Sequence, residues 1–154
     1  MSITARLREL NVILPQVAPP VGSYVPAKQV GELVLTSGQL PILNGELTAA
    51  GKVPEDVSLA DAQEAAMTAA VNALAAAASV FDGDIDRLAG IVRVAVFVNS
   101  SPGFTDQAQV ANGASDFLVA LFGESGRHVR AAVGVAELPL NAVVELELVA
   151  RVRP

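Results

Sequence analysis

Residues 91–98 form an almost uninterrupted apolar run, Ile-Val-Arg-Val-Ala-Val-Phe-Val, in which Arg93 is the only charged residue. A strand that is apolar at both odd and even positions is covered on both faces, whereas a half-exposed strand alternates apolar and polar residues. The run therefore predicts a strand inside a sheet, with other elements packed against it. Helical patterns before and after it in the sequence can supply part of that cover.

The two predicted helices differ in how their packing faces are made. The first begins at Ser58, which with Asp61 has the spacing of a capping box, and continues through an alanine-rich run to about Val80. The second begins near Thr105 and ends at Gly123. Its apolar residues recur at helical spacing and define one buried face: Val110, Ala114, Phe117, Leu118 and Leu121.

The N-terminal third of the chain favours short elements. An amphipathic helix is expected over residues 3–10, followed by a proline-containing extended segment to Pro20. Residues 21–30 and 32–37 predict two short strands around Gly31, and Asn44-Gly45 is typical of a hairpin turn.

Two further strands are predicted at the C-terminal end, over residues 130–136 and 143–149. The turn around Pro139 between them favours a simple hairpin. The complete order is strand pair, helix, strand, helix, two strands. It predicts an α+β fold with helices on one face of a sheet and the other face left for a partner.

Composition limits the domain organisation and the location of the protein. A chain of 154 residues with 52% hydrophobic residues can bury about two thirds of its unfolded surface as one domain, so we expect a single domain over residues 1–154, with 1–20 as an N-terminal extension. The mixed N-terminus predicts neither a signal peptide nor a membrane span. These features favour a cytoplasmic protein with no membrane partner.

Charge and residue usage exclude several functions. The absence of cysteine removes thiolate nucleophiles and zinc sites that need sulfur, and one histidine leaves the carboxylates without nitrogen partners for a metal. A net charge of -6, no tryptophan and no basic cluster disfavour nucleic acid as a partner. A mean hydropathy of +0.48 indicates apolar surface that a homo-oligomer would hide.

Arg130 and Glu145 are the candidate functional pair. The residues on the same strand face as Arg130 are small: Ala132, Gly134 and Ala136. They leave room for a ligand beside the long arginine side chain. In a simple hairpin the two side chains would be separated by about four residues, roughly 13 Å, and would bracket a ligand. Glu145 also shares its strand face with Glu147 and two arginines, so membership of a solvated face is the alternative for it.

Several segments together resemble the reactive intermediate deaminase family, the YjgF-type or endoribonuclease L-PSP-like proteins. The similarity covers residues 21–152, and its most specific part is the final block of arginine, Leu-Pro and V-E-x-E. The segments are Gly22-Ser23-Tyr24, residues 35–41, residues 96–98, Arg130, Leu138-Pro139 and residues 144–147.

The resemblance implies a chorismate-mutase-like fold, with two helices on one face of a mixed sheet, and a homotrimer with ligand clefts between subunits. It also implies that the last two strands flank a central strand instead of forming a hairpin, and on this point we follow the resemblance. Family members hydrolyse small reactive enamines and imines to 2-oxo acids and ammonia, without a cofactor or a metal. The expected partner is therefore a small substrate bearing a carboxylate.

The resemblance also implies roles for individual residues. Arg130 would hold the substrate carboxylate, while Glu145 would hold a water against the imine carbon and carry its proton to the leaving nitrogen. The backbone carbonyl of Ala132 would help to fix that water. Further positions that match the family's cleft and orient the substrate are Tyr24, Ser37, Gly38 and Asn112.

Two departures from the family pattern indicate a divergent branch. The family's Gly-Pro-Tyr is Gly22-Ser23-Tyr24 here, and its Pro-Ala-Arg is His128-Val129-Arg130. His128 is the single histidine, for which a structural role and a contact with the substrate are both open. The leading hypothesis is an imine hydrolase. The alternatives are a trimer that binds ligands or partners without turnover and, disfavoured by the acidic charge, an endoribonuclease or translation inhibitor.

Overall fold

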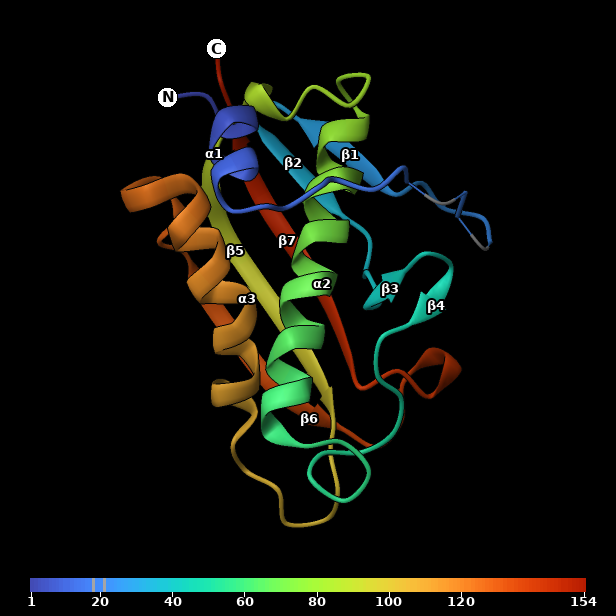
Figure 1. Cartoon of the computed structure of the whole chain (residues 1–154). Coiled ribbons are helices and arrows are strands. Elements are labelled where there is room, and N and C mark those ends of the chain that lie inside the picture. Colours follow the sequence, from blue (N-terminus) through green and yellow to red (C-terminus); the bar gives the residue numbers. More distant parts are fainter. Residues whose placement is uncertain (18, 21) are drawn as a thin grey trace.

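The computed structural model describes residues 1–17, 19–20 and 22–154. A five-stranded mixed sheet, ordered β1-β2-β7-β5-β6, is crossed on one face by two long helices (Figure 1). This arrangement confirms the predicted α+β fold with helices on one face. The strands are β1 (Ala27–Val30), β2 (Leu33–Thr36), β5 (Leu88–Asn99), β6 (Val129–Val135) and β7 (Val144–Val152).

The two helices pack closely on each other and on the sheet. Helix α2 (Leu59–Ser79) begins where Ser58 Oγ accepts the amide of Asp61 at 3.1 Å, which confirms the predicted cap. Helix α3 (Gln107–Phe122) begins two residues later than predicted and ends at Gly123. A Cβ atom on Gly113 would lie 2.0 Å from the carbonyl oxygen of Gln63, so this glycine sets the close approach of the helices.

Strand β5 lies inside the sheet, between β7 and β6, as the apolar run predicts. Its residues Val94, Val96 and Val98 are completely buried beneath the helices. On the opposite face Phe97 is only partly buried and Arg93 is exposed, because none of the described helices covers that face (Figure 1). We call the uncovered side of the sheet the open face.

The two C-terminal strands flank β5, so the order that the family resemblance implies is confirmed and the simple hairpin is wrong. Helix α3 is a crossover that returns the chain parallel to β5, and β6 therefore pairs with β5 in parallel. The chain then passes the end of β5 and β7 runs antiparallel on its other side. The buried Asn99 side chain holds this passage by donating to the carbonyl of Ala142 at 3.1 Å.

The N-terminal elements complete the fold. Helix α1 (Ile3–Glu9) is anchored by the amide of Thr4, which donates to Asp86 Oδ1 at 3.0 Å. Asn44 and Gly45, with φ of 53° and 82°, form the predicted turn between β3 (Ile42–Leu43) and β4 (Glu46–Leu47).

Other N-terminal expectations are met only in part. Strand β1 begins at Ala27, directly after Pro26, which has no amide hydrogen to donate to a ladder. It is therefore shorter than the predicted strand over residues 21–30, and residue 21 lies outside the described residues, as does residue 18 of the N-terminal extension. No helix in the described part of the chain is both long enough and apolar enough to span a bilayer.

Candidate active site

Arg130 lies on the edge strand β6 and its guanidinium is held by helix α3. Nη1 donates to Asn112 Oδ1 at 2.9 Å and to Ser115 Oγ at 3.0 Å, and Nη2 donates to the carbonyl of Ala108 at 3.2 Å. These acceptors are spaced i, i+4 and i+7 along α3, so they form one row on its surface. Asn112 was expected to orient the substrate. It contacts Arg130, the residue expected to hold the substrate carboxylate.

His128 belongs to the same cluster. Its Nε2 lies 2.9 Å from Ser115 Oγ and its Nδ1 lies 2.6 Å from the carbonyl oxygen of Gly126. A carbonyl only accepts, so Nδ1 carries a hydrogen and Nε2 of the neutral ring accepts from the serine hydroxyl. Histidine and arginine are therefore linked through one serine that the sequence analysis did not single out.

Glu145 lies half-buried near the start of β7, on the open face. Burial, and after it the charge of Glu147, raise the pKa of the Glu145 carboxyl above its usual range. Gly38 packs directly against this group, since a Cβ atom at Gly38 would lie 2.8 Å from Glu145 Oε1. The bridge between Gln39 and Leu146, with amide to carbonyl distances of 2.7 and 2.9 Å, holds the two segments together.

Ser37 and Tyr24 lie in the segment that leads to Gly38. Ser37 Oγ donates to the carbonyl of Val25 at 2.7 Å and its amide donates to Pro26, so the hydroxyl is used locally. Tyr24 is 51% exposed. Within residues 1–17, 19–20 and 22–154 the structure gives neither side chain a hydrogen bond to Arg130 or Glu145.

Arg130 and Glu145 lie on opposite faces of the sheet. Arg130 pairs with Val94 and Glu145 pairs with Phe97, and the pairing between these points has no register shift. Side chains alternate along a strand, so positions three apart point to opposite sides. Arg130 is on the helix face with Ala132, and Glu145 is on the open face. The hairpin geometry had suggested that these two side chains bracket a common ligand. Within one chain they do not.

Gly38→Ala should impair the candidate site without unfolding the protein. The added methyl group would overlap the Glu145 carboxylate, which can move because it is the end of a flexible side chain. We expect turnover that depends on the Glu145 carboxyl to fall by about 10²-fold, since displacement of a reacting group by about 1 Å costs that much. Steady-state kinetics measure the effect, and circular dichroism checks the fold. A variant as active as the parent would contradict the placement of Glu145.

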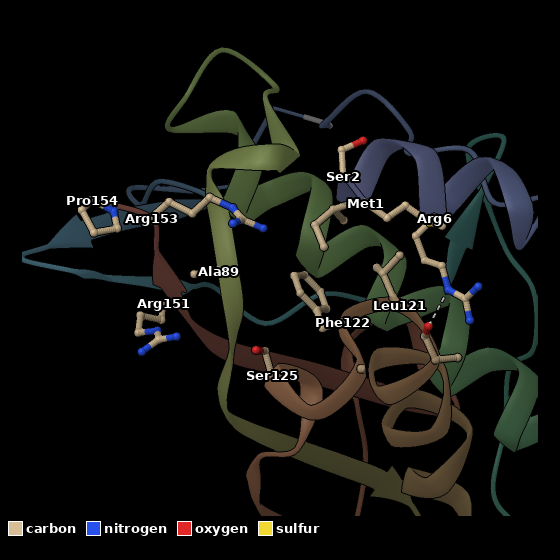
Figure 2. Close-up of a pocket in the computed structure, with 13 residues that line it drawn as sticks. Met1, Ser2, Arg6, Ala89, Leu121, Phe122, Ser125, Arg151, Arg153 and Pro154 are labelled. Atoms are coloured by element: carbon tan, nitrogen blue, oxygen red, sulfur yellow. Dashed lines mark hydrogen bonds between the residues drawn. The ribbon is translucent and has the colours of Figure 1, made fainter.

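A pocket of about 650 Å³ lies at the other end of the sheet (Figure 2). Two of its arginines are used by the chain itself: Arg6 donates to the carbonyl of Ala120 at 2.9 Å and Arg153 donates to that of Asp86 at 2.9 Å. Its wall at Ala89 is five residues, or about 16 Å, from Val94 beside Arg130. This pocket is therefore separate from the candidate site.

Metal ligands do not cluster in the described part of the chain: no group of three histidine, aspartate or glutamate side chains there is arranged to hold an ion. The described side chains offer two reactive groups. The Arg130 guanidinium is a fixed cation on the helix face of the sheet, and Glu145 on the open face has a carboxyl with a raised pKa. These suit the binding of a carboxylate and the transfer of a proton.

Comparison with known proteins identifies the family. The family model described as "YjgF/chorismate mutase-like, putative endoribonuclease" matches residues 4–152, and the chain belongs to this family. The protein Atu1372 of Agrobacterium tumefaciens, solved as a protein of unknown function, is 42% identical and superposes with a TM-score of 0.90. The similarity covers 98% of this chain and 92% of Atu1372.

Two other relatives extend the comparison. Protein TCP17 of Trypanosoma cruzi is 40% identical over 146 residues, which are 94% of this chain and 91% of that protein. TdcF of Escherichia coli, solved with bound serine, is 25% identical with a TM-score of 0.65, over 90% of this chain and 94% of TdcF. The similarity therefore spans nearly the whole chain in each case.

Proposed function

We propose that the protein hydrolyses small 2-imino acids and their enamine tautomers to 2-oxo acids and ammonia. The observation that carries this proposal is the cradle on α3, which fixes a guanidinium at the edge of the sheet with N–H groups to spare. Membership of the YjgF family supports the proposal, and so does TdcF, a relative that binds serine, a small molecule with a carboxylate.

The proposed site lies between subunits. Arg130 lies on the edge strand β6, where a second copy can approach, and Glu145 lies on the open face. We infer that Arg130 of one subunit and Glu145 of the next line the same cleft. The open face also presents apolar surface that a copy would cover, including Leu33, Leu35 and Val133, which are 38%, 43% and 47% exposed.

In the proposed mechanism, Arg130 holds the carboxylate and so places the imine carbon beside a water next to Glu145. The substrate reacts as the protonated imine. Ionised Glu145 takes a proton from the water as the water oxygen bonds to the imine carbon, and the imine nitrogen becomes a neutral amine. The protonated Glu145 then gives a proton to this nitrogen. The C–N bond breaks and ammonia leaves, while the hydroxyl proton passes to Glu145, which is ionised again at this point, and the carbonyl of the 2-oxo acid forms. A carboxyl with a raised pKa suits both transfers.

The remaining residues have supporting roles in this proposal. Ala132, two residues after Arg130 on the same face, would offer its carbonyl to the water. Gly38 lets the Glu145 carboxylate pack closely against its backbone and so helps to set the position of the carboxylate. Ser37 and Tyr24 would border the cleft. We place Asn112 and His128 behind Arg130, since both belong to its hydrogen-bonded cluster.

Release of ammonia tests the proposal against its alternatives. A pyridoxal-phosphate dehydratase generates 2-aminoacrylate and related imines from several amino acids, and formation of the 2-oxo acid is followed with and without this protein. Faster formation supports the hydrolase. Binding of 2-oxo acids without acceleration would indicate a trimer that binds ligands only. RNA cleavage by purified protein would favour the endoribonuclease of the family description, against the net charge of -6.

We expect the protein to sediment as a trimer at micromolar concentration. The open face carries exposed apolar side chains and the proposed cleft needs two subunits. Sedimentation velocity measures the mass, which should be near three times 15.8 kDa. A mass near one chain would contradict both the trimer and the shared cleft.

A further inference from the structure

Ser115 and His128 lie behind Arg130, and the proposed mechanism does not use them. We propose that they are positioning residues, which hold the Arg130 guanidinium with one edge open to a ligand carboxylate. The inference rests on the proposed role of Arg130, but it makes a separate claim about how this side chain is held. It is carried by the hydrogen-bond geometry around the guanidinium.

A count of donors shows what the cradle leaves free. A guanidinium has five N–H groups. Asn112 and Ser115 accept the two hydrogens of Nη1, and the Ala108 carbonyl accepts one hydrogen of Nη2. No other acceptor in the described part of the chain is hydrogen-bonded to Arg130, so Nε–H and the second Nη2–H remain. With the Nη1–Nη2 edge facing α3, these two hydrogens lie along the same edge of the planar group. That edge forms the fork that binds a carboxylate in a bidentate manner.

The order of acceptors along α3 determines which edge remains open. Ala108, Asn112 and Ser115 follow one another on one side of the helix, so the edge that contains Nη1 and Nη2 faces α3. The edge with Nε then faces away from the helix. Loss of one acceptor would let the guanidinium turn about its side-chain bonds, and the fork would no longer have a fixed direction.

His128 contributes by fixing the direction of the Ser115 hydroxyl. Because Nδ1–H donates to the Gly126 carbonyl, the unprotonated Nε2 accepts from Ser115. The serine oxygen is then left with lone pairs to accept from Arg130 Nη1 at 3.0 Å. The chain of donors therefore runs from Arg130 through Ser115 and His128 to Gly126. Without the ring, the hydroxyl is free to rotate and can direct its own hydrogen at the arginine.

The first measurement is made on Arg130 itself and needs no substrate. In the parent protein we expect slow rotation of the guanidinium, seen by NMR as separate Nη hydrogen signals that are assigned by their loss in Arg130→Lys. Ser115→Ala and His128→Leu should both accelerate this rotation and average the signals. Ser115→Thr keeps the hydroxyl and His128→Gln keeps an acceptor, so these variants should retain slow rotation.

The second measurement is affinity for 2-oxobutanoate, a stable carboxylate, by calorimetry. We expect Ser115→Ala to weaken binding about 3- to 10-fold and His128→Leu about 2- to 5-fold, as for the loss of one hydrogen bond. If the parent hydrolyses imines, KM should rise with kcat little changed. Ser79→Ala is the matched control, because it removes a helix hydroxyl that donates to Ala76 in α2, away from Arg130.

The outcomes separate this inference from the proposed function. Faster rotation and weaker binding in Ser115→Ala and His128→Leu, with Ser79→Ala unchanged, support the positioning role. Unchanged rotation in both variants overturns it, whatever their affinity. If the parent binds no 2-oxo acid, the proposed role of Arg130 fails, and the rotation measurement still decides whether Ser115 and His128 hold the guanidinium. Should Ser115→Ala fail to fold, His128→Leu and His128→Gln provide the same comparison.

Discussion

Glu145→Gln should lower kcat for imine hydrolysis by about 10²- to 10⁴-fold, while binding of a stable 2-oxo acid persists. The amide keeps the shape of the side chain against Gly38 but cannot accept the proton of the attacking water. The defect should therefore appear in turnover and not in affinity. Steady-state kinetics with enzymatically generated imines measure kcat, and calorimetry with 2-oxobutanoate measures affinity.

Glu147→Gln is the matched control for this variant. Glu147 lies two residues further on the same face and its Oε1 is 3.7 Å from Arg93 Nη1, a surface pair that contributes little. We expect kcat near the parent value. Because the charge of Glu147 helps to raise the pKa of Glu145, its removal should lower that pKa. The ionised base is lost as pH falls through the pKa, so the acidic limb of the rate profile should move to lower pH. Equal loss of kcat in both variants would contradict a specific role for Glu145.

Most of the architecture could be predicted from local patterns. The apolar run in β5 and the face of α3 each reflect burial that repeats along one element. The cap at Ser58 is a hydrogen bond between residues three apart, which the local sequence also shows. Strand order could not be obtained in this way, because alternation in residues 130–136 and 143–149 specifies two strands and not their neighbours. The turn at Pro139 favoured a hairpin, but the crossover through α3 places β5 between the two strands.

The candidate site was harder to predict for the same reason. Residue types indicated Arg130 and Glu145, but the faces on which they lie follow from their register against β5, which the sequence does not show. Ser115 was missed because a serine on a helix is ordinarily unremarkable. The spacing of residues 108, 112 and 115 was a usable signal only once Arg130 was known to face α3.

Arg130→Ala should abolish tight binding of 2-oxo acids, with a loss of about 2 to 5 kcal/mol, because the ligand carboxylate would enter the cleft without its partner. Arg130→Lys should recover only part of this affinity, since an ammonium cannot present a bidentate fork. Calorimetry with 2-oxobutanoate measures each variant, and circular dichroism confirms the fold.

Arg127→Ala is the control for the removal of a nearby cation. Its guanidinium is exposed and pairs with Glu124 at 3.0 Å, so its loss should leave affinity close to that of the parent. The Arg130 and Glu145 variants should then differ in kind, since the first loses ligand binding and the second loses turnover. If Arg130→Ala binds 2-oxobutanoate as well as Arg127→Ala does, Arg130 is not the carboxylate anchor. If Glu145→Gln is also fully active, both residues belong to the solvated surface and the proposed cleft does not exist.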